Sequence, residues 1–114
     1  IEALIMRLQL SRPGNTLLSP DLYNQFFTMH GTTMMFFFAV PVMEGFAIYL
    51  TPLMIGSRDM AFPRLNAFGY YVYLIAGVAL YVSFFLGMAP DAGWFAYTPL
   101  SNREYSPGLR MDVW

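Results

Sequence analysis

Two long apolar stretches dominate the pattern of hydrophobic and polar positions along the chain. The first runs from about Leu22 to about Leu53, and the second covers residues 67–89 without a single charged side chain. At 1.5 Å per residue, a helix over the second stretch spans roughly 34 Å, which matches the hydrocarbon thickness of a bilayer. The pattern therefore predicts two helices that each cross a membrane.

Helix-breaking residues separate these stretches from the rest of the chain. Pro13 and Gly14 end a shorter apolar helical segment, and Gly56 and Pro63 interrupt the polar connector between the long stretches. After residue 89 the chain is rich in proline, glycine and turn residues, which predicts an external loop. We expect one all-α membrane domain made of a helix end, two complete helices and a loop, at residues 1–10, 22–53, 67–89 and 90–114.

Single residues refine this picture. Asp21 follows a Ser-Pro pair and is the expected N-cap of the first long helix. Pro41 lies inside that helix and should bend it, because proline removes one backbone hydrogen bond and clashes with the preceding turn. Gly69 and Gly77 give the second helix small surfaces for close packing against a neighbour.

Composition supports a membrane environment. Hydrophobic residues make up 57% of the chain and charged residues 11%, with a mean hydropathy of +0.47. A soluble domain carries about 25% charged residues. The net charge of −1 gives no support for nucleic-acid binding, and the absence of cysteine excludes disulfides and thiolate metal sites within the chain. Because the chain starts at Ile1 within an apolar pattern, we expect a fragment of a longer membrane protein.

The only histidine, His30, lies near the start of the first long stretch. One interpretation is an interfacial histidine that is hydrogen-bonded to a neighbouring helix. The other is a metal or haem ligand, since neutral imidazole is the commonest metal ligand in proteins. Gly31 would then let a flat macrocycle approach the backbone. A second axial ligand would have to be a methionine of this chain or come from elsewhere in the parent protein.

Acidic residues offer a second kind of chemistry. Glu44 follows His30 by fourteen residues, which on a regular helix places both within about 40° of one face. A carboxyl group inside a membrane is costly and points to a proton relay, or alternatively to a structural hydrogen bond. Asp59 and Asn66 bracket the connector, where Asp59 taken alone reads as a solvated loop acid. No nucleophile–base pair or phosphate-binding loop supports a hydrolase.

Three motifs carry a resemblance to a known family. The segments "TMHG", "PLMIGSRDMAFPRLN" and "GWFAYTPLSNREYSPG" resemble subunit I of the haem–copper terminal oxidases, the cytochrome c oxidase family. The resemblance covers essentially the whole chain. It implies a bundle of the twelve-helix type, in which this chain supplies the end of the first helix, all of the second and third, and the loop toward the fourth.

The resemblance also implies roles for single residues near the external loop. His30 matches the histidine that is one axial ligand of the low-spin haem, of a or b type. Arg7 matches an arginine that contacts the periphery of that haem and would otherwise be read as a residue snorkelling to the interface. Trp94 and Tyr97 match a loop near the haem propionates.

On the connector side the resemblance implies a proton-uptake channel. Asp59 matches the acid at its mouth, and Asn66 matches an asparagine just inside. Many family members carry a second asparagine eleven residues before the acid, where this chain has Ile48. We hypothesise that Glu44, one turn away, takes over part of its water-binding role. The implied orientation places the connector on the cytoplasmic or matrix side, whereas the arginine distribution favours the opposite orientation.

The implied activity is that of the parent enzyme, a proton-pumping cytochrome c oxidase that reduces oxygen to water. Its high-spin haem and copper B would have their ligands outside this chain, so the chain alone should be inactive. Implied partners are other oxidase subunits, notably subunit II, together with cytochrome c, oxygen and membrane lipid, but no nucleic acid. We expect a multi-pass protein of a bacterial cell membrane in preference to a mitochondrial inner membrane.

Two other interpretations stay open. A quinol oxidase of the same superfamily is one, since Glu2 lies where an acid serves the quinol site in that branch. The other is a non-catalytic two-helix membrane anchor that holds a haem. The uncharged stretch at residues 67–89 is compatible with such an anchor, but the connector motif is not.

Overall fold

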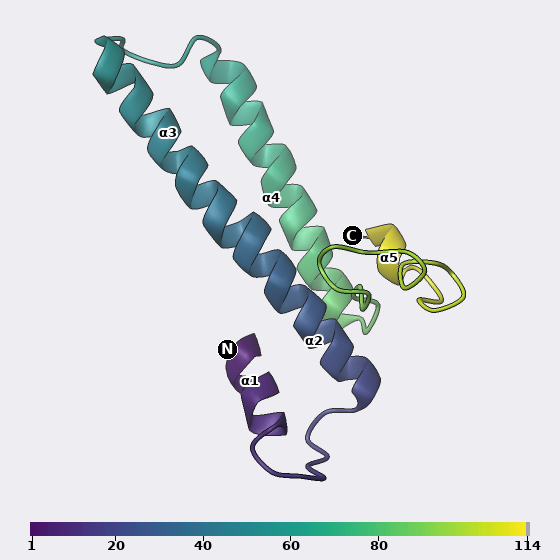
Figure 1. The fold of residues 1–114 in the computed structure, drawn as a ribbon. Helices are drawn as coiled ribbons and strands as arrows, with labels where there is room; N and C mark the ends of the chain where they lie inside the picture. The colour runs from purple at the N-terminus through teal and green to yellow at the C-terminus, as the bar shows by residue number, and fades with distance from the viewer. Residues whose placement is uncertain (114) are drawn as a thin grey trace.

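Two long antiparallel helices form the body of the molecule (Figure 1). The computed structural model describes residues 1–113, and regular structure within that range is entirely helical. Two of its helical stretches, Pro20–Ile55 and Pro63–Phe85, are long and apolar enough to cross a membrane. The predicted all-α membrane class is confirmed. The elements in chain order are α1 (Glu2–Gln9), α2 (Pro20–Thr32), a π-helical segment (Thr33–Ala39), α3 (Val40–Ile55), α4 (Pro63–Phe85) and α5 (Arg110–Val113).

The start of α2 differs from the sequence prediction. The N-cap is Ser19, whose hydroxyl accepts a hydrogen bond from the Leu22 amide at 3.2 Å, and Pro20 occupies the first turn. Asp21 was expected in this role. Proline is well accommodated at the first helical position because the amide hydrogen it lacks would have no helical partner there. The cap therefore lies two residues earlier than predicted.

The π-helical segment lies immediately before Pro41 and connects α2 to α3 in one continuous column (Figure 1). A π turn contains more residues than an α turn, so each residue advances less around the axis. The single face predicted for His30 and Glu44 is therefore wrong. His30 faces α1, where it lies near Glu2, whereas Glu44 borders a groove against α4.

The second long helix is offset from its predicted range. It begins at Pro63 and ends at Phe85, four residues earlier at each end than residues 67–89. Proline again occupies the first turn, which places Asn66 inside the helix instead of the connector. At its other end, Gly87 adopts a positive φ of 70°, which favours glycine and ends the helix.

The two long helices pack through small and aromatic residues. Gly77 is buried, and a Cβ added there would lie 2.4 Å from Cε1 of Phe37, so the missing side chain makes room for that ring. This confirms the prediction of close packing at Gly77. Nearby, the hydroxyl groups of Thr33 and Tyr81 are 2.6 Å apart and form a hydrogen bond between the columns. Met29 and Leu80 belong to the small buried core beside this contact.

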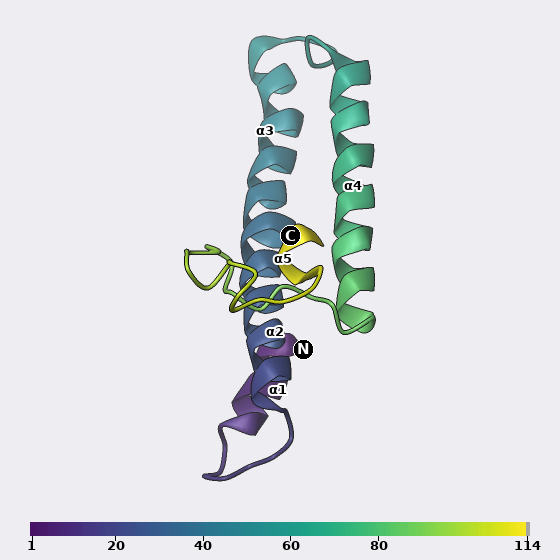
Figure 2. The same ribbon diagram turned by 90° about the vertical axis from the view of Figure 1, so that its right-hand side faces the viewer.

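The segment after α4 folds back against α2 (Figure 2). Nη1 of Arg110 lies 2.5 Å from Oδ1 of Asp21 and 2.6 Å from Oδ2 of Asp91. The Ser106 hydroxyl also donates a hydrogen bond to Asp91. The hydrogen bonds to Asp21 and Asp91 raise the pKa of the Arg110 guanidinium above its usual value. We call Arg110, Asp21 and Asp91 the loop clamp.

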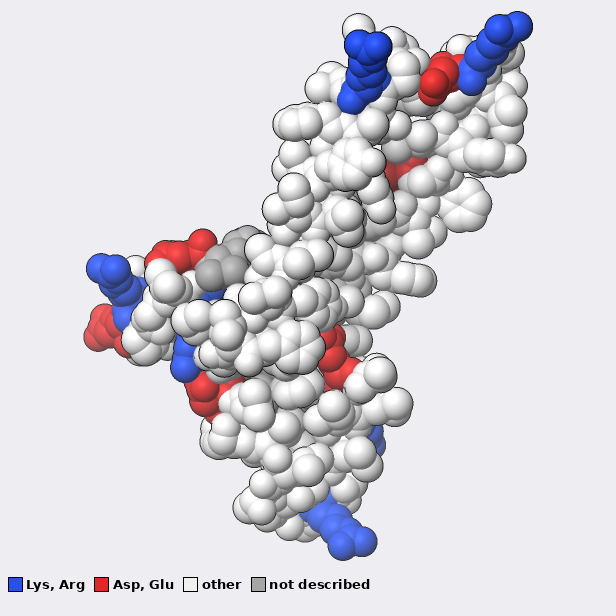
Figure 3. All heavy atoms as spheres, turned by 180° about the vertical axis from the view of Figure 1, so that it is seen from behind, with Lys and Arg blue, Asp and Glu red and all other residues white. Residues whose placement is uncertain are grey.

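Charged side chains gather away from the middle of the long helices. On the face in Figure 3, they lie mainly near the connector and around the loops, while uncharged atoms cover most of the helical body. Most large apolar side chains of α3 and α4 are exposed, among them Phe46, Leu53 and Ile75. Lipid or further helices can cover such a surface, because neither requires it to be polar.

Candidate functional site

The histidine site lies between α1 and α2. His30 is in the last turn of α2, and its Nδ1 lies 3.9 Å from Oε2 of Glu2. That distance is too long for a hydrogen bond but short enough for a charge interaction when the imidazole is protonated. The His30 side chain is 36% exposed, against 18% for Glu2. The imidazole therefore has an acid beside one nitrogen and an accessible side.

The residue after the histidine does not serve the purpose that the sequence suggested. A Cβ added to Gly31 would lie 2.8 Å from Cδ1 of Trp94 and 3.2 Å from its Cβ and Cγ. The space expected for a flat macrocycle is therefore filled by this indole. Gly31 allows the external loop, in place of a cofactor, to approach the helix.

Two loop residues predicted for the same site have different surroundings. The Gly93 amide donates a hydrogen bond of 2.9 Å to Oγ1 of Thr28, which ties the loop to α2 and holds Trp94 against it. Tyr97 stacks on Phe95, with ring centroids 5.3 Å apart, and is exposed. The structure thus places Trp94 beside the histidine helix and Tyr97 at the loop surface.

Arg7 lies in the last turn of α1 and is exposed. It follows Glu2 by five residues, which corresponds to about 140° around a regular helix. Because Glu2 faces His30, Arg7 points toward a different side of α1. The structure therefore does not bring this arginine onto the face that meets the histidine.

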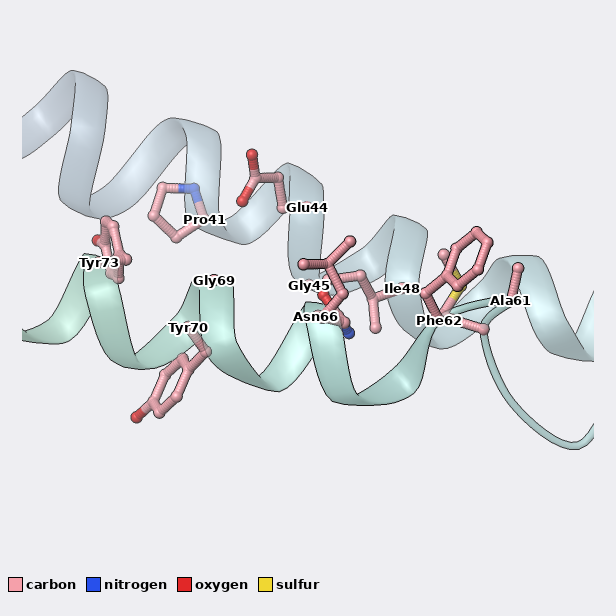
Figure 4. A pocket seen from close by; sticks show the side chains of 12 residues that line it. Pro41, Glu44, Gly45, Ile48, Ala61, Phe62, Asn66, Gly69, Tyr70 and Tyr73 are labelled. Atoms are coloured by element: carbon pink, nitrogen blue, oxygen red, sulfur yellow. The ribbon is translucent and has the colours of Figure 1, made fainter.

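A groove between α3 and α4 forms the second site (Figure 4). Its volume is about 690 Å³, and its lining includes Glu44, Ile48, Asn66 and Tyr73. The predicted pair of Glu44 and Asn66 therefore shares one cavity, although the two residues come from different helices. The groove extends to the last residues of the connector, Met60 to Phe62.

Asp59 lies one residue before that end of the groove. It is exposed, and its Oδ1 accepts a hydrogen bond of 2.8 Å from the Met60 amide. The Ser57 hydroxyl donates a hydrogen bond of 2.8 Å to the Asp59 carbonyl. These bonds fix the acid at the surface of the turn, next to the groove mouth.

Comparison with known proteins identifies the family. The family model described as cytochrome c and quinol oxidase polypeptide I matches residues 1–114. The chain belongs to this family. It is 54% identical over 113 residues to the probable cytochrome c oxidase subunit 1-beta of Nocardia farcinica, covering 98% of this chain and 19% of that protein.

Other curated members of the polypeptide I family give the same picture. Cytochrome c oxidase subunit 1 of Corynebacterium glutamicum is 49% identical over 113 residues, covering 98% of this chain and 19% of the relative. Cytochrome c oxidase subunit 1 of Alkalihalophilus pseudofirmus is 47% identical over 114 residues, covering 100% of this chain and 18% of that relative. The chain thus spans about a fifth of the length of these relatives.

The residues around His30 fit one axial position of a haem. An imidazole is a suitable donor for haem iron, and about a third of this side chain is accessible. Gly31 is occupied by Trp94, so a haem would approach His30 from another side of the helix. The fit therefore rests on the exposed imidazole and not on the adjacent glycine.

Sequence reasoning missed several contacts at both sites. Glu2 was considered only for a quinol site, yet it is the acid beside His30. Thr28 and Tyr73 were not among the candidate site residues, although Thr28 anchors the loop and Tyr73 lines the groove. These pairings join residues that are 28 to 65 positions apart or come from separate helices, so no local spacing reveals them.

Proposed function

We propose that this chain is the part of a haem–copper terminal oxidase subunit I that holds the low-spin haem near one membrane face and admits protons from the other. The proposal is carried by the separation of its two candidate sites along a pair of apolar helices. His30 and Glu44 are fourteen residues apart, which is about 20 Å of helix. Such a separation suits electron entry on the loop side and proton uptake on the connector side.

His30 would be an axial ligand of the low-spin haem. Glu2, next to Nδ1, favours an orientation in which the other imidazole nitrogen is available to iron. When bound, the haem supplies one-electron transfer. Arg7, Trp94 and Tyr97 would contact its periphery, and the Thr28–Gly93 hydrogen bond would hold the loop in place. The second axial ligand would come from outside this chain.

Asp59, Asn66 and Glu44 would form the entrance of the proton pathway. Asp59 is exposed beside the groove and can collect protons from the aqueous phase. Asn66 and Glu44 line the groove, where their polar atoms can bind water between apolar walls. Glu44 would compensate for the apolar Ile48, which lines the same groove.

The parent protein would be a proton-pumping cytochrome c oxidase that reduces oxygen to water, with a high-spin haem and copper B held elsewhere. Its partners would be other oxidase subunits, notably subunit II, together with cytochrome c, which the names of the relatives contain. Quinol is the second candidate donor, supported by the proximity of Glu2 to His30. The setting would be a bacterial cell membrane with the connector facing the cytoplasm, and the isolated chain would be inactive.

The haem assignment is tested in the intact oxidase with His30→Gly. We expect the six-coordinate low-spin haem to disappear from the reduced-minus-oxidised spectrum, and added imidazole to restore it by filling the vacated position. Restoration separates loss of a ligand from loss of folding. An unaltered low-spin spectrum in His30→Gly would contradict the assignment.

The proton pathway is tested with Glu44→Leu and Asp59→Asn in the same enzyme. We expect slower proton uptake and weaker pumping in reconstituted vesicles, because each change removes a group that binds water or a proton. Glu104→Gln is the matched control, since this exposed acid lies in the external loop. Pumping equal to that of the control variant would rule out the pathway.

A further inference from the structure

Tyr73 occupies the junction of two adjoining cavities between the long helices. The first is the groove described above, and the second has a volume of about 340 Å³. Pro41, Glu44 and Tyr73 line both cavities, while Asn66 lines only the first and Thr32 only the second. A water-filled route from Asn66 to Thr32 through these two cavities therefore passes the side chains of Pro41, Glu44 and Tyr73.

The hydroxyl group of Tyr73 has a fixed direction. It donates a hydrogen bond of 3.0 Å to the carbonyl oxygen of Phe36, in the π-helical segment. Phe36 precedes Pro41 by five residues, which is the π-helical hydrogen-bond spacing, and proline has no amide hydrogen to donate. The tyrosine thus supplies a hydrogen bond to a carbonyl that Pro41 cannot serve.

This direction determines what the hydroxyl oxygen can do in the cavity. A phenol has a single hydrogen to donate and can also accept hydrogen bonds. Because the hydrogen points to Phe36, the oxygen of Tyr73 can act toward the cavity only as an acceptor. Glu44 lines the same two cavities as Tyr73. The partner that can link them is therefore a water molecule between the Tyr73 oxygen and the Glu44 carboxyl group.

We propose that Tyr73 is a positioning residue of the proton pathway, which orients Glu44 and its bound water through the oxygen of a hydroxyl anchored on the π-helical segment. The inference rests on the proposed function of Glu44. A proton arriving through water in the first cavity bonds to the Glu44 carboxylate. It leaves to water in the second cavity, which regenerates the carboxylate. Tyr73 keeps its own proton throughout.

The structure also offers a matched control. Tyr71 lies on the same helix two residues before Tyr73, which is about 200° around the axis, so it faces away from the groove. It does not line either cavity. Phenylalanine at position 73 or 71 removes one hydroxyl group and preserves the ring, so the two variants differ in which face of α4 loses an oxygen.

The experiment compares Tyr73→Phe and Tyr71→Phe in the intact oxidase. Each variant is used only if its haem spectrum equals that of the unmodified enzyme. We expect Tyr73→Phe to slow proton uptake by roughly two- to tenfold, the range given by loss of one hydrogen bond. We also expect the infrared carboxyl band of Glu44, assigned by its absence in Glu44→Gln, to move to higher wavenumber. Tyr71→Phe should change neither quantity.

Other outcomes overturn the inference in distinguishable ways. If Asp59→Asn and Glu44→Gln slow uptake but Tyr73→Phe alters neither rate nor band, Tyr73 has no positioning role and the pathway stands. A slower rate with an unmoved Glu44 band indicates a purely structural effect and also refutes the inference. If Asp59→Asn and Glu44→Gln leave uptake unchanged, the pathway proposal fails together with the role of Tyr73.

Discussion

Replacing Gly31 by alanine tests how closely the external loop approaches the histidine helix. In α2 this change gains about 1 kcal/mol of helix propensity, because glycine has more backbone freedom to lose. Against this gain, the new Cβ would lie 2.8 Å from Cδ1 of Trp94 and 3.2 Å from its Cβ and Cγ. Ordinary carbon–carbon contacts are about 3.5–4.0 Å, so the overlap is substantial.

The overlap cannot be relieved by rotating the indole alone. Two of the three close atoms, Cβ and Cγ, are at the base of the Trp94 side chain, and the preceding Gly93 amide is bonded to Thr28. Overpacking of this kind costs about 1–3 kcal/mol. After subtraction of the propensity gain, we expect Gly31→Ala to lower the free energy of unfolding by up to about 2 kcal/mol.

A double-mutant cycle with Trp94→Ala is the appropriate assay. Unfolding of the purified intact subunit in detergent, followed by helicity, gives the free energy of unfolding for each variant. Gly31→Ala should destabilise the Trp94 protein but slightly stabilise the Trp94→Ala protein, which corresponds to a coupling energy within the range for residues in contact. An equal effect of Gly31→Ala in both backgrounds would refute the packing argument.

Further predictions concern the elements that support these sites. Arg110→Met leaves the largely buried carboxylate of Asp91 without its charged partner, which should lower the free energy of unfolding by about 1.5–3 kcal/mol. We therefore expect faster limited proteolysis of the external loop. An unchanged cleavage rate would show that the loop clamp does not hold the loop. Ser19→Ala should lower the free energy of unfolding by about 1 kcal/mol and speed amide exchange in the first turn of α2. Unchanged exchange in that turn would show that the Ser19 cap does not stabilise the helix. Tyr81→Phe should lower the free energy of unfolding by about 1 kcal/mol, because the hydrogen bond to Thr33 is lost. Adding Thr33→Val to the Tyr81→Phe protein should lower it little further, since that hydrogen bond is already absent.

The sequence alone was sufficient for the helices and the family. A long uncharged stretch has few alternatives to a membrane helix, because backbone groups in lipid must be hydrogen-bonded within the segment. The connector motif has a spacing that composition does not produce, and the family match over residues 1–114 agrees with it. The sequence also singled out Glu44 and Asn66, although only the packing of α3 against α4 places both on one groove.

Local rules failed where another part of the chain sets the geometry. The prediction that His30 and Glu44 share a face assumed a uniform α-helix, and the π-helical segment before Pro41 changes that rotation. The purpose of Gly31 depends on Trp94, which is 63 residues away, and the fixed direction of the Tyr73 hydroxyl depends on Phe36. Hydrophobic pattern and length determine which segments become helices, because both are properties of the segment itself. Which side chains meet is decided only when the helices and the loop pack, because each contact depends on the rotation and position of two segments at once.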